Sequence, residues 1–225
     1  TRRITRLNND IRKAKLNATL QLTARGVPFI YYGEEIGMTQ HSLPMKTSTD
    51  PLAMKYSWIP QILINFYRKI TGESINRLEC RTPMQWNTSP NAGFCDSNVE
   101  PWIPVTDSYK DRNVEKETLN PDSLLNCYKR LLDLRQKYPA LNSGTLNLLD
   151  IGDNSDWIVG YSRSIELREN LQILHIYLNF SKEQIAFQPI SPISKFLFST
   201  YIKIDNRNLN YLKLKSFEGI IVLLK

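Results

Sequence analysis

A stretch rich in arginine, tryptophan, proline and glycine occupies residues 81–102 of this 225-residue chain. It opens with the letters RTPMQW and contains Arg81, Trp86 and Trp102. Arginine supplies forked hydrogen-bond donors for hydroxyl groups and tryptophan offers a flat apolar face, so together they suit a sugar. No helical or strand period runs through the stretch, and an ordered loop of this length usually carries a binding surface. The alternative is a proline-rich loop held together by its own aromatic side chains.

Carboxylates are the other groups that could act on a sugar, as the acid and the base of glycoside hydrolysis. Glu34 and Glu35 are adjacent in the sequence, so on an extended backbone they point to opposite sides and cannot flank one bond. The acidic residues between positions 107 and 117 have the pattern of solvated loop charge. Because a catalytic pair needs burial and a fixed separation, we expect none within these residues.

The composition, with 41% hydrophobic and 23% charged residues, is that of an ordinary globular protein. The net charge of +7 raises the question of a nucleic-acid partner. The basic residues are scattered, however, and only Arg2, Arg3 and Arg6 cluster. We therefore predict no nucleic-acid partner, and no membrane partner because no apolar run is long enough to cross a bilayer.

The cysteines Cys80, Cys95 and Cys127 are odd in number and contain no C-x-x-C pair. The two histidines, His41 and His175, are not placed to complete a metal site. This pattern favours reduced thiols in a cytoplasmic protein without a metal or cofactor, with a Cys80–Cys95 disulfide left open.

The elements that position these groups begin with an amphipathic helix that follows the polar caps Asn8, Asn9 and Asp10 and runs to about Ala24. Residues 27–32 then form a continuous apolar run that ends at Gly33. Such a run is typical of a strand buried on both faces of a parallel sheet. Helix and strand together would form half of an α/β repeat.

Residues 38–119 are mostly irregular, apart from a short helix expected at 60–70. Asn120 and Pro121 predict the N-cap and first position of a helix that stops before Pro139. Beyond Gly144 the chain has short alternating or apolar runs at strand spacing, which favour a small all-β domain. The runs are residues 145–149, 157–163, 172–179, 184–188, 196–203 and 219–225.

Several segments together resemble the α-amylase family of glycoside hydrolases, glycoside hydrolase family 13. VPFIYYGEEIGM at 27–38 is similar to the last barrel strand of that family. CRTPMQW at 80–86, with NAGF at 91–94 and Trp102, resembles the following loop in the α-glucosidase and oligo-1,6-glucosidase branch. Asn113 after Tyr109 fits the same branch, whereas Leu78 stands where the family usually carries an acid.

The resemblance implies an α/β plus all-β chain. Residues 1–143 would form the C-terminal part of a (β/α)8 TIM barrel, including the long loop after the last strand. Residues 144–225 would form an antiparallel β-sandwich. It also implies retaining hydrolysis of α-1,4 or α-1,6 glucosidic bonds through a carboxylate nucleophile and a carboxylic acid/base.

For the site, the resemblance implies that Arg81 holds the hydroxyl groups of a bound glucose, and that Arg3 lies beside the last catalytic aspartate. The family's catalytic residues would all precede Thr1, so none is expected in this chain. The missing starting Met fits a processed chain or a fragment that needs an N-terminal barrel portion to act. Glu34 is expected to tie the strand end, and Trp86 and Trp102 to pack the loop.

Other functions remain open at this point. One is a non-catalytic relative like the heavy chains of amino-acid transporters, which share this barrel. Another is an inactive remnant that only binds sugar.

Overall fold

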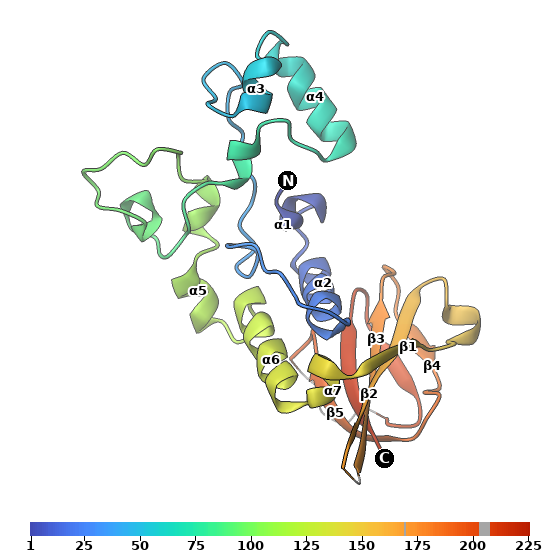
Figure 1. Ribbon diagram of the computed structural model, residues 1–225. Coiled ribbons are helices and arrows are strands. Elements are labelled where there is room, and N and C mark those ends of the chain that lie inside the picture. Colours follow the sequence, from blue (N-terminus) through green and yellow to red (C-terminus); the bar gives the residue numbers. More distant parts are fainter. Residues whose placement is uncertain (169, 203–207) are drawn as a thin grey trace. The chain divides into compact units, whose positions relative to one another are not determined.

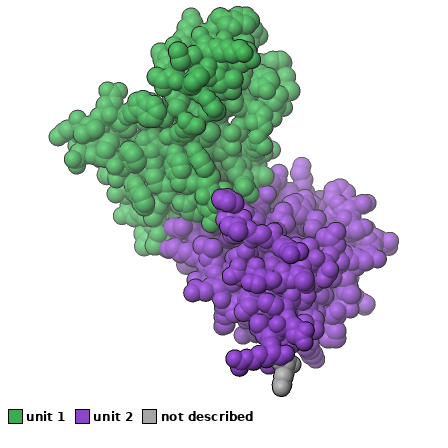
Figure 2. All heavy atoms as spheres, in the orientation of Figure 1, with its two compact units in different colours: residues 1–10, 30–120 green, residues 11–29, 121–225 purple. Residues whose placement is uncertain are grey.

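The computed structural model describes residues 1–168, 170–202 and 208–225. The described chain falls into two compact units (Figure 2). The first consists of residues 1–10 and 30–120, and the second of residues 11–29 and 121–225. The predicted boundary at 143/144 lies inside the second unit, between a helix and a strand, so the assignment of a barrel part and a β domain on either side of it stays a prediction.

The second unit is built around an antiparallel sheet of five strands in the order β1-β2-β3-β7-β5 (Figure 1). A smaller antiparallel sheet pairs β4 with β6. The strands are β1 (Thr145–Leu148), β2 (Ile158–Leu167), β3 (Asn170–Asn179), β4 (Ile185–Phe187), β5 (Ile193–Ser199), β6 (Leu212–Leu214) and β7 (Gly219–Leu224).

The core of this unit draws on both sheets. Ile158, Tyr177 and Val222 of the large sheet cluster with Phe187 and Leu212 of the small one. Tyr177 and Phe187 meet edge to face, with their ring centroids 5.2 Å apart. Alternation along the strands turns these apolar side chains to one side, which is how half-buried strands build a core.

Helices α2 (Ile11–Thr23) and α6 (Leu124–Lys137) pack against each other and against this sheet, with the short α7 (Pro139–Ser143) beside β2 and β3 (Figure 1). The apolar side of α2 is buried, as expected for an amphipathic helix, and Ala18 and Leu22 are fully inaccessible. A buried Arg163 on β2 ties the helix end to the sheet. Its guanidinium donates to the carbonyls of Thr23 at 2.5 Å, Gly144 at 3.0 Å and Thr145 at 3.2 Å.

The first unit is made of short helices and loops. Its elements are α1 (Arg3–Arg6), α3 (Pro51–Lys55), α4 (Gln61–Thr71), the 3-10 helices η1 (Arg77–Cys80), η2 (Pro90–Gly93) and η3 (Asp107–Lys110), and α5 (Val114–Leu119). The predicted short helix at 60–70 is confirmed as α4. None of the described residues of this unit belongs to a strand.

The predicted buried strand at residues 27–32 is wrong in this structure. The segment is extended or turning, and its side chains are exposed, with Val27 at 78% and Phe29 at 83%. A strand needs neighbours to satisfy its backbone groups, and no described segment pairs with this one. The apolar run is therefore present without the sheet that would cover it.

Other predictions were nearly right. The helix after residue 120 is α6, but its N-cap is Ser123, whose Oγ accepts a hydrogen bond from the Asn126 amide at 3.1 Å, so the predicted cap at Asn120 is wrong. Six predicted runs match strands, although Lys203, the end of one run, lies outside the described residues. The three-residue strand β6 was not predicted.

The three cysteines are free, so no Cys80–Cys95 disulfide forms. Cys127 is buried on α6, and burial raises the pKa of its thiol to about 11. Within the described parts of the chain, no helix combines the length and the apolar character needed to cross a bilayer.

Candidate functional site

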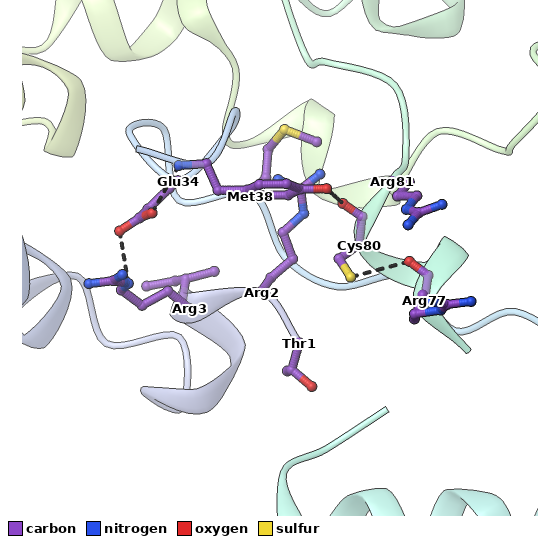
Figure 3. A pocket seen from close by; sticks show the side chains of 10 residues that line it. Thr1, Arg2, Arg3, Glu34, Met38, Arg77, Cys80 and Arg81 are labelled. Atoms are coloured by element: carbon purple, nitrogen blue, oxygen red, sulfur yellow. Dashed lines mark hydrogen bonds and ion pairs between the residues drawn. The ribbon is translucent and has the colours of Figure 1, made fainter. Parts of the chain in front are cut away.

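A cavity of about 370 Å³ lies in the first unit and brings both predicted site residues together (Figure 3). It forms where the first residues of the chain meet the turn after residue 30 and the 3-10 helix η1. Its lining residues are Thr1, Arg2, Arg3, Ile4, Tyr31, Glu34, Met38, Arg77, Cys80 and Arg81.

Arg81 is placed by the end of η1. The Asn76 side chain caps this helix by accepting the Leu78 amide at 3.2 Å, and the Arg81 amide donates to the Leu78 carbonyl at 2.9 Å. The Arg81 side chain is exposed and forms no hydrogen bond or ion pair with any residue that the structure describes (Figure 3). An arginine that braced its own loop would be paired, so this guanidinium has the freedom that a ligand-holding group requires.

Arg3 opens helix α1, and its Nε lies 2.8 Å from a carboxylate oxygen of Glu34 (Figure 3). The Glu34 side chain is only 8% exposed, against 41% for Arg3. Glu34 also accepts the backbone amide of Tyr31 at 3.3 Å. The ion pair between Arg3 and Glu34 therefore holds the Arg3 guanidinium at the cavity wall. The hydrogen bond from Tyr31 holds Glu34 in the turn that follows residue 30.

Arg2 is a cavity residue that the sequence did not reveal. It is only 3% exposed, and its guanidinium lies over the rings of Tyr31 and Tyr32 at 5.2 and 4.7 Å from their centroids. One nitrogen donates to the Tyr32 carbonyl, while Nε and Nη2 are buried without a partner among the described residues. Buried donors are almost always satisfied, so these two nitrogens are exceptions at the wall of the cavity.

The charge of Arg2 also affects the pKa of the neighbouring Tyr32. Burial raises the pKa of the Tyr32 hydroxyl, and the nearby Arg2 charge opposes that rise. The Tyr32 hydroxyl donates to the Thr82 carbonyl at 3.1 Å, which links the turn after residue 30 to the loop that Arg81 opens.

A buried carboxylate, Glu79, lies directly after Leu78 and just before the loop. Glu79 is 2% exposed and accepts hydrogen bonds from Gln40 Nε2 at 2.7 Å and from the Leu43 amide at 3.0 Å. It also accepts a hydrogen bond from the Ser74 hydroxyl at 2.5 Å and forms an ion pair with Arg68 Nη1 at 3.5 Å. Glu79 therefore holds together the segments that precede Arg81.

A second ion pair holds the start of η1. One oxygen of the buried Asp50, Oδ1, accepts hydrogen bonds from Arg77 Nε at 2.8 Å and Nη2 at 2.5 Å. The other oxygen, Oδ2, accepts a hydrogen bond from the Arg77 backbone amide at 2.9 Å. Burial acts to raise the pKa of Asp50, but the hydrogen bonds and charge of Arg77 outweigh it and lower the pKa.

A second cavity, of about 560 Å³, lies on the other side of Arg81. It is mostly aromatic and apolar, with one carboxyl group, from Glu35. Its lining residues are Tyr32, Glu35, Arg81, Thr82, Pro83, Met84, Trp86, Phe94, Pro101, Trp102 and Ile103.

The tryptophans do not pack the loop, contrary to prediction. Trp86 is 48% exposed and Trp102 is 76% exposed, and both line the second cavity. The loop is held by polar contacts instead. The buried Gln85 donates to the Thr106 carbonyl at 3.2 Å, and Asn91 Nδ2 donates to the Val99 carbonyl at 2.8 Å. These contacts leave the ring faces available to a ligand.

The turn at the tip of the loop requires an unusual backbone. Asn91, Ala92 and Gly93 have positive φ values of 55°, 55° and 66°. Ala92 is fully buried, and its carbonyl accepts the amides of Trp86 at 2.9 Å and Asn87 at 3.2 Å. A β-carbon at Gly93 would come within 2.7 Å of the Asn87 side chain, so only glycine fits here.

The adjacent carboxyls Glu34 and Glu35 line different cavities. One oxygen of Glu35 is buried without a partner among the described residues, and burial raises the pKa of this carboxyl. The two side chains thus do not face one bond. In the described residues, histidine, cysteine and carboxylate side chains do not gather in a group of three that could hold a metal ion.

Known proteins are similar to the chain both in sequence and in structure. The model of the family described as "Alpha amylase, catalytic domain" matches residues 1–144. An oligo-1,6-glucosidase of Parageobacillus thermoglucosidasius is 31% identical over 97% of this chain and 40% of its own length. The alpha-glucosidase MAL12 of Saccharomyces cerevisiae is 30% identical over the whole chain and 40% of its own length.

The structure is similar to those of two sugar synthases. The trehalulose synthase MutB from Pseudomonas mesoacidophila MX-45 superposes with a TM-score of 0.77 at 26% identity, over the whole chain and 41% of the enzyme. The isomaltulose synthase PalI from Klebsiella sp. LX3 superposes with a TM-score of 0.74 at 27% identity, over 95% of the chain and 38% of the enzyme. The chain thus spans about two fifths of the length of the relatives it matches.

Proposed function

The chain belongs to the alpha-amylase family, and on that premise we propose that it is the C-terminal portion of a glycoside hydrolase that cleaves α-glucosidic bonds. The observation that carries the proposal is the exposed guanidinium of Arg81, which has no partner among the described residues and lines both a cavity with charged side chains and an aromatic one. Arginine donors and exposed tryptophan faces are the two kinds of contact that a glucose ring accepts.

In this proposal Arg81 donates to two hydroxyl groups of the glucose at the end of an α-1,4- or α-1,6-linked oligosaccharide. The planar fork of the guanidinium favours such paired oxygens over a single one. Arg3, held by Glu34, stands beside the position of the catalytic aspartate. Trp86 and Trp102 offer apolar faces to the next sugar of the substrate.

The cleavage itself requires carboxylates that these residues do not bring together. Retaining hydrolysis needs two carboxyl groups about 5 Å apart on either side of one bond. Glu34 is paired to Arg3 and Glu35 lies in the other cavity, so neither is placed for that role. We propose that the nucleophile and the acid/base come from an N-terminal barrel portion, as in the longer relatives.

The same portion would cover the apolar residues 27–32 as neighbouring barrel strands. Beyond them, we propose that residues 144–225 form the family's β-sandwich, since the large and the small sheet share one core. A cytoplasmic location and an α-glucoside substrate complete the proposal. The relatives named above are glucosidases and the trehalulose and isomaltulose synthases, which favours a glycosidase over the transporter and remnant alternatives.

The proposal is tested by joining the chain to the part it needs. We would co-express it with the N-terminal portion of the Parageobacillus oligo-1,6-glucosidase, confirm that the two parts co-purify, and assay a chromogenic α-glucoside. The complex should be active and the 225-residue chain alone inactive. Activity of the chain alone would show that its own carboxylates cleave, and an assembled but inactive complex would contradict the glycosidase proposal.

Arg81 is then tested within the active complex. Replacing it by Ala should lower kcat/KM by about a hundredfold, because two charge-assisted hydrogen bonds are lost. Arg81→Lys keeps the charge but loses the fork, so it should recover only part of the loss. Lys110→Ala, an exposed basic residue of the same unit, is the matched control and should leave kcat/KM unchanged.

A further inference from the structure

Helix α4 of the first unit carries its apolar face on the outside. Ile62, Phe66 and Ile70 follow one another at helical spacing and are 75%, 62% and 67% exposed. Leu63 and Tyr67 lie beside them and are 56% and 44% exposed. These residues form what we call the α4 face. Globular proteins seldom leave a contiguous apolar surface of this kind without a binding partner.

The inner side of the same helix is mainly polar. Gln61 Oε1 accepts the Met45 amide at 3.1 Å, and Arg68 Nη1 lies 3.5 Å from the buried Glu79. Only Ile64 turns inward to an apolar cluster, which it forms with Met45 and Ala53. Rotating the helix to turn its apolar face inward would break both polar contacts, so these contacts hold the apolar face outward.

The exposed charge of residues 38–72, the segment that contains this face, is of one sign. Residues 38–72 contain a single carboxylate, Asp50, which is buried and paired with Arg77. The next two carboxylates along the chain are also paired, Glu73 with Arg6 and Glu79 with Arg68.

The lysines of residues 38–72, unlike the carboxylate of this segment, are exposed. They are Lys46, Lys55 and Lys69. Lys69 lies on α4 next to Ile70, on the edge of the α4 face. Trp58, which is 77% exposed, precedes the helix. The surface chemistry of residues 38–72 is therefore apolar, aromatic and positive, without exposed negative charge.

We propose that the α4 face binds the surface of a membrane rich in anionic lipids. A helix with an apolar face and flanking lysines lies in the plane of such an interface, with its apolar side chains at the level of the acyl boundary. Lysines near the surface add attraction to anionic headgroups, and aromatic residues favour the same depth. Nucleic acid would use the lysines but gain nothing from Ile62, Phe66 and Ile70. This contact is peripheral, so it differs from the spanning segment whose absence led us to predict no membrane partner.

Vesicle co-sedimentation of the full 225-residue chain tests the proposal. The chain should sediment with vesicles of phosphatidylcholine and phosphatidylglycerol at a ratio of about 7:3, and bind pure phosphatidylcholine roughly tenfold more weakly. Raising the salt concentration should weaken the binding to the anionic vesicles, because the attraction of the lysines is screened.

Two variants separate the contributions. Replacing Ile62, Phe66 and Ile70 together by Ser should reduce binding at least about tenfold, since their apolar area no longer enters the interface. Replacing Lys46, Lys55 and Lys69 by Gln should abolish the preference for anionic vesicles. All six side chains are exposed, so both variants should fold, as checked by circular dichroism.

The matched control removes the same number of exposed apolar side chains elsewhere, by the triple change Leu119→Ser, Leu148→Ser and Leu171→Ser. It should bind vesicles like the unchanged chain. Equal binding by the α4 variant and the control would overturn the proposal. So would absence of vesicle binding together with a dimer in size-exclusion chromatography that the α4 variant abolishes, because the face would then be a protein–protein interface.

Discussion

Residues 27–32 and strand β7 (Gly219–Leu224) are apolar segments of equal length with opposite surroundings. In β7, Ile220, Ile221 and Val222 are fully buried. Along residues 27–32, Val27 and Phe29 are more than three quarters exposed and no strand forms. The two segments would receive similar strand predictions from their composition alone.

The difference lies in their neighbours. Val222 is paired with His175 of β3 on one side and with Phe196 of β5 on the other, so its backbone groups are satisfied and its side chain meets a core. No described segment offers residues 27–32 such an edge. An apolar run therefore indicates that a segment can form a buried strand. Whether the strand forms depends on the segments that pair with it.

The largest expected effect tests this contrast with one substitution at two sites. Val222→Asp places an unpaired charge in the core and should cost more than about 4 kcal/mol of the free energy of unfolding, enough to unfold a protein of ordinary stability. Val27→Asp, at a side chain that is 78% exposed, should change it by less than about 0.5 kcal/mol. Urea denaturation followed by circular dichroism measures both.

A large cost at Val27 would break the comparison, because it would mean that residues 27–32 are covered in solution. Sedimentation velocity of the unchanged chain would then show whether self-association supplies the cover.

A smaller effect is expected where the sheet is tied to the end of helix α2. Arg163→Met keeps the apolar stem but leaves the carbonyls of Thr23, Gly144 and Thr145 without their donor. The loss should be about 3 kcal/mol, the cost of leaving buried acceptors unsatisfied. Arg81→Met is the matched control, since that exposed guanidinium has no partner among the described residues, and it should leave the denaturation midpoint within experimental error. A similar loss at both arginines would contradict the argument.

The smallest effect concerns His175, which lies in β3 beside β7 and is 4% exposed. Burial lowers its pKa below the ordinary 6.5, so the unfolded chain binds more protons than the folded one as the pH falls below that value. Stability should thus be level above pH 6.5 and decline below it, by up to about 1.4 kcal/mol per pH unit.

The measurement is the free energy of unfolding between pH 7.5 and 5.5. His175→Gln should remove the part of the decline that this group causes, whereas His41→Gln, the same change at the other histidine, should keep it. An unchanged slope in His175→Gln would show that other groups cause the pH dependence.

Local patterns predicted much of the fold. Helices α2 and α4 follow from the spacing of their apolar residues, and the strands of the large sheet follow from alternating or apolar runs between turn residues. Strand β6 was missed, although β4, which is equally short, was predicted from the run at 184–188. The N-cap of α6 moved from Asn120 to Ser123 because either residue can cap, and only packing chooses between them.

The candidate site was predictable where its residues are local. Arg81 belongs to a compact motif, and the structure places it with Arg3 at one cavity. Arg2 was not predictable, because its burial depends on Tyr31 and Tyr32, which come from a turn some thirty residues away. The exposure of Trp86 was missed because Gln85 and its polar partners hold the loop in place of the aromatic rings.

Cys80 gives the smaller cavity a site for chemical labelling. Its half-buried thiol lies in the wall that Arg81 shares, whereas Cys127 is buried and its raised pKa of about 11 keeps the reactive thiolate scarce at neutral pH. With Cys95 replaced by Ser, a thiol-reactive fluorophore would attach mainly at Cys80. Its emission would then report directly on what enters the cavity, without a need for turnover.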